Sequence, residues 1–226
     1  AGAFAFLVAP GRATRAQKAP FLCRNYAHRG LHTEDGSVPE NSLPAFRAAA
    51  EAGYAVEMDV HLTADDQLVV FHDDTLDRVC GVCARVDELT LAELKALRLC
   101  GTEQTIPLFT EVLDVIRGRG PIICELKDGK RNRELCEKTY DIISAYRGEI
   151  CVESFNPMIV AWFRFHAMDL LRGKLALPTR FYDAECLSAP LAFALGHTLF
   201  NCVARPQFIA YRIGFRPLSV RISEFM

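Results

Sequence analysis

Short runs of β-branched and apolar residues alternate with helix-like patterns from residue 26 onward, and this alternation constrains the fold more than any other feature. It is typical of βα units that build a parallel sheet. Seven strands are predicted, over residues 25–29, 55–60, 67–72, 121–126, 149–154, 171–177 and 208–213. The sequence therefore predicts an α/β protein in which these strands are parallel.

Seven parallel strands with helices between them come one short of a TIM-type (β/α)8 barrel. The chain has 226 residues, fewer than the ~250 typical of that fold. It ends in "RPLSVRISEFM" without a recognisable eighth strand. We therefore expect either a barrel that lacks its eighth strand and is incomplete at the C-terminus, or an open sheet.

The first predicted helix has clear boundaries. Asn41 or Ser42 can cap its start, and Pro44 suits its first turn. Gly53 can end it. A helix is therefore expected between the first two strands.

About 50 residues separate the third and fourth predicted strands, more than a single crossover helix needs. Within them, Thr90 and Glu93 have the spacing of a capping box. We expect a small insertion over residues 74–107, within one domain that covers residues 25–226.

Residues 1–24 form an apolar and then basic leader. The first nine, "AGAFAFLVA", are apolar, and basic residues follow. Nine residues are too few to cross a bilayer, which takes about 20. The segment is either the end of a transmembrane helix, with the basic residues on the cytoplasmic side, or a frayed apolar leader.

The composition excludes some partners and favours one compartment. Half of the residues are hydrophobic, and the formal net charge of −2 provides no global field that gathers nucleic acid. The nine cysteines are odd in number and irregularly spaced, as expected of buried thiols in a reducing compartment. We expect a cytoplasmic protein without a nucleic-acid partner, with membrane association possible through the leader.

Two pairs of charged residues have a spacing that places both side chains on one face of a strand. Glu57 and Asp59 lie about 6–7 Å apart on the second strand. Glu125 and Lys127 have the same spacing at the end of the fourth. Carboxylates that are buried together need a compensating cation. Three of them at adjacent strand ends make an all-oxygen site, which suits one divalent ion, Ca²⁺ or Mg²⁺.

Two histidines close predicted strands, His28 the first and His72 the third. In a barrel both would lie at the C-terminal rim, where such enzymes have their active sites. Imidazoles there can give and take protons near neutral pH. Because these histidines and the charged pairs fall at four successive strand ends, a shared site is favoured over unrelated structural histidines.

Two further side chains belong to the same region. His61 continues the alternation of Glu57 and Asp59, but it falls where the second strand is expected to enter a loop, so a ligand role is not favoured. Asp73 is expected in a turn after His72 and could orient that imidazole.

The motifs, in chain order, are "AHRG", "PENSLPAF" (39–46), "VEMDVHLTADDQLVVFHDDTLDR" (56–78), "ELK" and "VESFNP" (152–157). Together they resemble the glycerophosphodiester phosphodiesterase family over about residues 24–213, in particular bacterial members that contain "YAHRGLH" and an N-terminal membrane segment. The resemblance implies a TIM-type barrel, a divalent metal ion and a hydrolase of lipid or glycerol metabolism.

The resemblance also implies roles for single residues. His28 and His72 match the acid/base pair of the family, and Glu57, Asp59 and Glu125 match its metal ligands. A further set would bind the phosphate, shape the rim and line the pocket. In that order its members are Arg29 and Lys127, Glu40 and Asn41, and Ser154 and Phe155.

The implied reaction is hydrolysis of a small-molecule glycerophosphodiester to sn-glycerol 3-phosphate and an alcohol. One histidine would deprotonate a hydroxyl, from water or from the glycerol, and the other would protonate the departing alcohol; the residues do not assign which does which. Family barrels finish with a strand that carries a tryptophan-threonine pair, whereas the single tryptophan here is Trp162. The alternative is therefore an inactive truncated barrel that binds metal or glycerophosphate without turnover.

Overall fold

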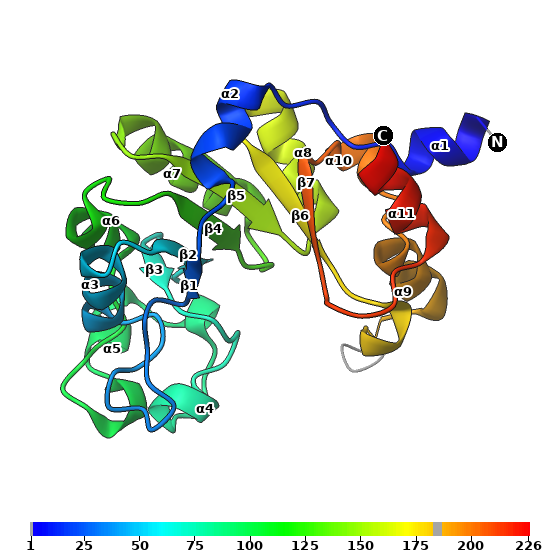
Figure 1. Ribbon diagram of the computed structural model, residues 1–226. Coiled ribbons are helices and arrows are strands. Elements are labelled where there is room, and N and C mark those ends of the chain that lie inside the picture. The colour runs from blue at the N-terminus through cyan, green and yellow to red at the C-terminus, as the bar shows by residue number, and fades with distance from the viewer. Residues whose placement is uncertain (1, 183–186) are drawn as a thin grey trace. The chain divides into compact units, whose positions relative to one another are not determined.

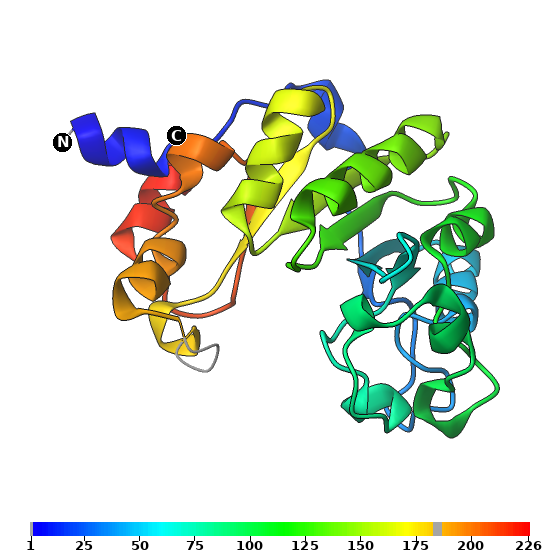
Figure 2. The same cartoon turned by 180° about the vertical axis from the view of Figure 1, so that it is seen from behind.

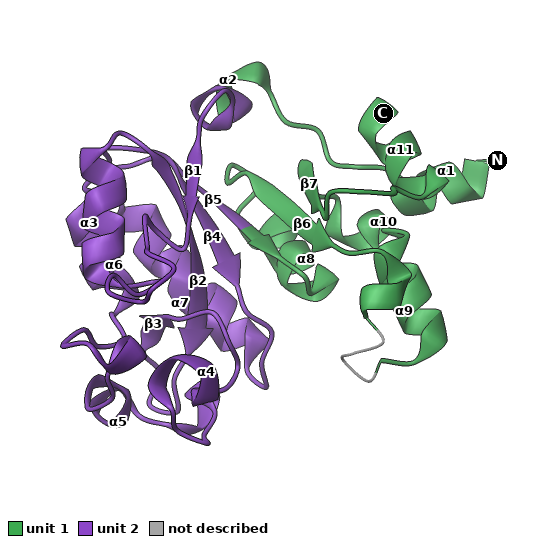
Figure 3. Cartoon of the chain, turned by 60° about the horizontal axis from the view of Figure 1, so that its bottom comes forward, with its two compact units in different colours: residues 1–17, 153–226 green, residues 18–152 purple. Residues whose placement is uncertain are grey.

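The computed structural model describes residues 2–182 and 187–226. The chain folds into two compact units (Figure 3). Residues 18–152 form one, here called the central unit, and residues 1–17 together with 153–226 form the other, called the terminal unit. The candidate metal ligands and both candidate histidines belong to the central unit.

The central unit alternates strands and helices. Its strands are β1 (Tyr26–His28), β2 (Ala55–Leu62), β3 (Leu68–Val70), β4 (Ile122–Leu126) and β5 (Ile150–Ser154), the last of which continues into the terminal unit. Its α-helices are α3 (Leu43–Glu51), α4 (Asp77–Cys80), α5 (Leu91–Lys95), α6 (Phe109–Ile116) and α7 (Asn132–Ala145). Short 3₁₀ turns cover η1 (Ala19–Phe21), η2 (Val86–Glu88) and η3 (Leu99–Gly101). All strands predicted for this region are present.

The sheet of the central unit is built on β2. Strands β1 and β4 flank β2, and both pair with it in parallel. Every residue of β2 is buried, which is expected of a central parallel strand with covered faces. Helices α3 and α6 lie side by side next to this sheet (Figure 1). The parallel sheet predicted from the alternating pattern is therefore present.

The third strand is not parallel, contrary to the sequence-based prediction. β3 pairs antiparallel with β2, with Val60 opposite Val70 and Leu62 opposite Leu68. Only residues 63–67 connect the two strands, and the amide of Thr63 donates to the carbonyl of Gln67 (2.9 Å). A connection this short allows a hairpin, whereas a parallel partner needs a crossover of a dozen or more residues. β3 therefore lies off the parallel path of the sheet.

Helix α3 begins with Ser42 as its N-cap, which settles the choice between Asn41 and Ser42. The Ser42 hydroxyl accepts from the amide of Ala45, and proline follows within the first helical positions. Gly53 has a φ of 76° just beyond the helix, as a C-terminal glycine should. Asn41 is thereby free to direct its side chain elsewhere, and its contact is described below.

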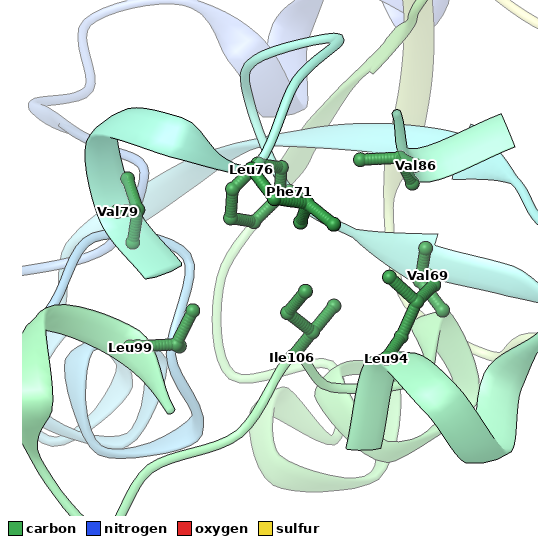
Figure 4. Close-up of a cluster of buried hydrophobic side chains, with 8 residues drawn as sticks. All are labelled: Val69, Phe71, Leu76, Val79, Val86, Leu94, Leu99 and Ile106. Carbon is green, nitrogen blue, oxygen red and sulfur yellow. The ribbon is translucent and has the colours of Figure 1, made fainter. Parts of the chain in front are cut away.

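The segment between β3 and α6 contains α4, η2, α5 and η3, and it packs on β3 through a shared hydrophobic cluster (Figure 4). The predicted capping box of Thr90 and Glu93 starts α5. The cluster joins β3 to this segment through eight buried side chains: Val69, Phe71, Leu76, Val79, Val86, Leu94, Leu99 and Ile106. Their burial anchors the residues that follow His72, including α4.

The terminal unit contains the two remaining strands. β6 (Arg172–Ala176) and β7 (Phe208–Tyr211) pair in parallel. Its helices are α1 (Gly2–Val8), α8 (Pro157–His166), α9 (Ala189–Gly196), α10 (Asn201–Ala204) and α11 (Leu218–Phe225), with a 3₁₀ turn at η4 (Thr179–Phe181). The short helix α2 (Arg15–Lys18) begins in this unit and ends on the first residue of the central unit. In this unit α8 runs along β6 and packs against α10 (Figure 2).

The apolar leader forms the short helix α1, which packs on the C-terminal helices of its own unit. The Val8 side chain is fully buried, and its carbonyl accepts from Asn201 (3.0 Å) and from Ser223 (2.7 Å). Among the described residues, no helix combines the length and the apolar character that crossing a bilayer requires.

The cysteines are less uniformly buried than the sequence suggests. Cys124, Cys136 and Cys151 are buried, whereas five others are exposed or partly exposed: Cys23, Cys80, Cys83, Cys100 and Cys202. All eight are free thiols. Cys186 lies outside the described residues.

Candidate active site

The register of the parallel strands brings the predicted site residues together. His28 at the end of β1 lies opposite Glu57, and Asp59 lies opposite Glu125 on β4. His72 arrives by the antiparallel hairpin, since the amide of Phe71 donates to the carbonyl of Asp59 (3.0 Å). The hairpin therefore returns His72 to the level of the carboxylates, although β3 runs in the direction opposite to the one predicted.

Glu57, Asp59 and Glu125 form a compact carboxylate cluster. One oxygen from each residue lies within 4.8 Å of the others, and all three residues are buried. Three carboxylates can hold one cation through oxygen ligands alone, the arrangement preferred by Ca²⁺ and Mg²⁺. The donor set therefore fits a divalent ion, while it does not distinguish the two metals.

Lys127 compensates part of the negative charge of this carboxylate cluster. Lys127 Nζ lies 2.9 Å from Glu125 Oε1 and 3.3 Å from Asp59 Oδ1. Burial nevertheless raises the pKa of Glu125 to about 7, and the negative charge of the neighbouring Asp59 acts in the same direction. Burial acts against Asp59 as well, but Lys127 and other neighbours hold the pKa of Asp59 below its ordinary value. A divalent cation would supply the missing positive charge.

Arg29 directly follows the end of β1 and lies next to the carboxylate cluster. Its backbone amide donates to Glu57 Oε2 (3.1 Å), and its Nε lies 3.7 Å from Asp59 Oδ2. The Arg29 side chain and Lys127 thus contribute two cations at one site. Such a pair is suited to a phosphate, whose charge it can share.

Asn41 holds Asp59 rather than capping α3. Its Nδ2 donates to Asp59 Oδ2 (2.9 Å), and its backbone amide donates to the carbonyl of Arg29 (2.9 Å). Both Asn41 and Arg29 have a positive φ, 54° and 58° respectively. Non-glycine residues adopt this conformation in only a few per cent of cases, and asparagine does so more readily than most.

Two buried polar atoms next to the carboxylate cluster have no hydrogen-bond partner among the described residues. They are Asn41 Oδ1 and Arg29 Nε. Buried polar groups are normally paired, so an unpaired acceptor and an unpaired donor beside a cluster of carboxylates are expected where a ligand binds. Both residues contact Asp59, so these atoms lie where a metal ion or an anion would bind.

The two candidate histidines differ in their surroundings. The His28 side chain is 66% exposed, and its Nε2 lies 3.8 Å from Glu57 Oε2. His72 is more enclosed, and its Nδ1 lies 2.5 Å from Asp73 Oδ1. Burial lowers the pKa of both imidazoles, aided by Arg29 at His28 and by Lys127 at His72. The imidazoles are also close enough for a charge on His72 to lower the pKa of His28.

His61 is part of β2, which continues to Leu62 instead of entering a loop. The sequence-based expectation that the strand ends before His61 is therefore wrong. His61 does not belong to the described carboxylate cluster; its Nε2 lies 3.4 Å from the carbonyl of His72. Burial lowers the pKa of His61 to about 4, so the ring is neutral near pH 7.

A pocket of about 290 Å³ adjoins these residues in the central unit. His61 and Lys127 line it together with the start of α7, including Asn132 and Leu135. Lys127 therefore contacts both the carboxylate cluster and this pocket.

Three ion pairs that the sequence does not predict complete the site. Glu40, expected at the rim, accepts from Arg29 (3.0 Å) and also from Arg78 of α4 (2.6 Å). Arg78 Nε donates in addition to Asp73 Oδ2 (2.6 Å). In the sequence, Arg78 is the last residue of a motif that ends in "TLDR". That position does not indicate which residues Arg78 contacts.

Ser154 and Phe155 belong to the terminal unit. Ser154 is fully buried, and its hydroxyl accepts from the amide of Asn156 (3.1 Å). Phe155 packs against the cluster formed by Tyr182, Ala192 and Leu195. A role for Ser154 and Phe155 in lining a substrate pocket stays a prediction.

The fold and the site together define an α/β protein with a candidate divalent-metal centre at the strand ends. The chain belongs to the glycerophosphoryl diester phosphodiesterase family, whose family model matches residues 28–202. This range contains every site residue predicted from the sequence.

Alignments with relatives from this family cover up to about two thirds of the chain. A glycerophosphodiester phosphodiesterase from Caldanaerobacter subterraneus subsp. tengcongensis is 35% identical over 143 residues, 58% of this chain and 57% of the relative. Lysophospholipase D GDPD1 from Rattus norvegicus is 32% identical over 159 residues, 65% of this chain and 49% of the relative. The chain thus spans about half the length of these curated relatives.

Solved structures with the same fold cover most of the chain. A phosphodiesterase from Oleispira antarctica, in complex with the product sn-glycerol-3-phosphate, superposes with a TM-score of 0.64 at 21% identity, covering 84% of this chain and 93% of that one. A glycerophosphoryl diester phosphodiesterase described as putative, from Silicibacter pomeroyi, gives 0.62 at 21% identity and covers 99% of this chain and 98% of that one. These neighbours are TIM-type barrels, so the predicted fold class is confirmed.

Proposed function

We propose that this chain is a metal-dependent phosphodiesterase that hydrolyses a glycerophosphodiester to sn-glycerol 3-phosphate and an alcohol. The observation that carries the proposal is the convergence of three buried carboxylates, two cations and two imidazoles within the central unit. Family membership supports the same reaction class. The product complex of the Oleispira antarctica phosphodiesterase supports the choice of product.

Glu57, Asp59 and Glu125 would hold the divalent ion, Ca²⁺ or Mg²⁺. Such an ion, when bound, polarises a phosphoryl oxygen and offsets the charge that grows in the transition state. Arg29 and Lys127 would bind the remaining phosphoryl oxygens and share that charge. Asn41 would keep Asp59 in place through its 2.9 Å hydrogen bond, and Glu40 would do the same for Arg29.

His28 and His72 would carry the protons. One would accept the proton of the attacking hydroxyl, from water or from the substrate glycerol, and the other would donate a proton to the oxygen of the leaving alcohol. Both have a lowered pKa and are largely neutral near pH 7. Asp73 accepts from Nδ1 of His72, which leaves Nε2 for the substrate. Ser154 and Phe155 would line the site as the family resemblance implies.

The remaining expectations concern location and scope. We also propose that the protein is cytoplasmic and takes part in lipid or glycerol metabolism. Residues 1–9 would be the segment through which it associates with a membrane. The leaving alcohol is not assigned, and the name lysophospholipase D of the rat relative makes a lysophospholipid a second substrate to assay beside glycerophosphocholine.

The test is release of sn-glycerol 3-phosphate from glycerophosphocholine by the purified chain, with Ca²⁺, with Mg²⁺ and with a chelator. We expect release with at least one metal and none with the chelator. A folded chain that binds the metal but releases no product from glycerophosphocholine or from a lysophospholipid would instead support the alternative, an inactive chain that binds metal or glycerophosphate without turnover.

A further inference from the structure

Arg78 bridges two carboxylates next to the site, and no other described arginine of the central unit bridges this pair. Its guanidinium reaches Glu40 through two nitrogens, at 2.6 and 3.1 Å. Its third nitrogen, Nε, donates to Asp73 Oδ2 at 2.6 Å. A single planar group therefore joins two carboxylates that are 33 positions apart in the sequence.

Each of these carboxylates also contacts one member of the proposed machinery. Glu40 Oε1 accepts from Arg29, the cation beside the carboxylate cluster (3.0 Å). Asp73 Oδ1 contacts Nδ1 of His72 (2.5 Å). A continuous chain of hydrogen bonds thus runs from Arg29 through Glu40, Arg78 and Asp73 to His72.

We propose that Arg78 is a positioning residue that couples the orientation of the phosphate-binding Arg29 to that of the proton-transferring His72. The proposal rests on the proposed phosphodiesterase function. Arg78 would not touch the substrate; it would act through Glu40 and Asp73. A guanidinium suits this task because its donors lie in a fixed plane and can serve two carboxylates at once, which a lysine ammonium cannot do in the same geometry.

The charge balance of the network agrees with this role. Hydrogen bonds from Arg78 and His72 outweigh burial and hold the pKa of Asp73 at about 2. Arg78 and Arg29 likewise outweigh burial and lower the pKa of Glu40. Without Arg78, Glu40 and Asp73 would lose their shared counter-charge, and each would be free to move with the residue it holds.

The competing interpretation is an ordinary surface ion pair. The Arg78 side chain is 51% exposed, and isolated pairs at such positions contribute little. Two features favour the positioning role. The contact with Glu40 uses two nitrogens rather than one, and both carboxylates continue to site residues.

The matched control is Arg85, which lies in the same segment between β3 and α6. It also contacts two carboxylates, Asp87 at 2.9 Å and Asp74 at 3.7 Å. Neither of these is bonded to Arg29 or to His72 in the described structure. Arg85→Ala therefore removes a comparable exposed cation while leaving the proposed coupling intact.

The experiment measures kcat and KM for glycerophosphocholine in the wild-type chain, Arg78→Ala, Arg78→Lys and Arg85→Ala, with thermal unfolding as a folding control. We expect Arg78→Ala to raise KM and to lower kcat on the order of 10–100-fold, the range that is typical when residues orienting metal ligands are lost. Arg78→Lys should recover only part of this loss, and Arg85→Ala should match the wild type.

Two comparisons separate positioning from a structural role. Guanidinium ions at millimolar concentration should restore part of the activity of Arg78→Ala, because the side chain leaves an exposed gap between two carboxylates, and should not stimulate Arg85→Ala. Asp73→Asn should reproduce mainly the loss in kcat and Glu40→Gln mainly the rise in KM. When Asp73→Asn or Glu40→Gln is combined with Arg78→Ala, the effects of the two substitutions on kcat and on KM should not add.

An active wild-type chain with an equally active Arg78→Ala would overturn the positioning role and leave the proposed function standing. The positioning role would also be overturned if Arg78→Ala lost activity only because it unfolded, and if neither guanidinium nor Arg78→Lys restored the activity. An inactive wild-type chain would instead overturn the proposed function, and the positioning role with it.

Discussion

Nδ1 of His72 lies 2.5 Å from Oδ1 of Asp73, and the other oxygen of Asp73 is held by Arg78. The imidazole is therefore fixed by a carboxylate that is itself fixed. This arrangement sets the ring nitrogen that faces the substrate and raises the basicity of the ring against the effects of burial and Lys127.

Asp73→Asn should move one limb of the pH–rate profile to lower pH. The contact with Asp73 raises the pKa of His72, so its removal lowers that pKa further. If His72 is the base, the acid limb of kcat/KM moves; if it is the acid, the alkaline limb moves. The profile therefore also assigns the role that the sequence left open. A profile whose limbs keep their positions would show that Asp73 does not control His72.

His72→Ala should abolish most of the turnover and leave metal binding intact. Loss of a general acid or base lowers the rate on the order of 10²–10⁴-fold, while His72 is not a member of the carboxylate cluster. The measurements are product release and calorimetric titration with the metal. His166→Ala, an exposed histidine of α8 in the terminal unit, is the control. Loss of metal binding in His72→Ala would mean that the histidine is a ligand instead.

Glu125→Gln should change how the stability of the metal-free protein depends on pH. The pKa of Glu125 is raised from 4.5 to about 7 in the folded chain, so its contribution is fully present below pH 4.5 and is lost as pH rises through 7. The buried histidines act in the opposite direction, so the informative quantity is the difference between the two proteins.

Urea unfolding from pH 5 to pH 8 in the presence of a chelator would measure this difference. The variant should gain stability relative to the wild type as pH rises across that window. Glu137→Gln, on the exposed side of α7, is the control because Glu137 is 44% exposed and pairs with Arg133. Parallel curves for the wild type and Glu125→Gln would contradict the raised pKa.

Gly30→Ala should destabilise the central unit by on the order of 2 kcal/mol or more. Gly30 has a φ of 80°, and a β-carbon there would lie 2.8 Å from the carbonyl carbon of Ala45. The start of α3 and the turn that carries Arg29 would both have to move.

Gly53→Ala is the matched control for this prediction. Gly53 has a similar φ of 76°, but a β-carbon there would meet nothing within 4 Å. It should therefore cost only the conformational strain, about 1 kcal/mol. Denaturant unfolding of the two variants separates strain from steric conflict, and equal losses would show that the contact with Ala45 is unimportant.

The sequence predicted the strands and the shared face of Glu57 and Asp59 because both depend on local spacing. Glu57 and Asp59 share a face of one strand whatever surrounds them. The direction of β3 was missed, although the five residues 63–67 between the strands are too few for a parallel connection. That signal was available in the loop length.

Other features could not be obtained from local pattern. Arg78 acquires its role only when α4 packs next to the turn that carries Glu40, a tertiary contact with no trace in residue spacing. Asn41 and Ser42 are both good capping residues, and the choice between them is made by the hydrogen bond that Asn41 gives to Asp59. Such choices follow from the assembled sheet.

The most direct test of the central claim is the number of divalent ions bound by the purified chain and its Asp59→Asn variant, measured by calorimetric titration with Ca²⁺ and with Mg²⁺. Asp59 is 1% exposed and lies within the carboxylate cluster. The account predicts one ion per wild-type chain and strongly weakened binding in the variant. Absence of binding by the folded wild type, or equal binding by the variant, would contradict it.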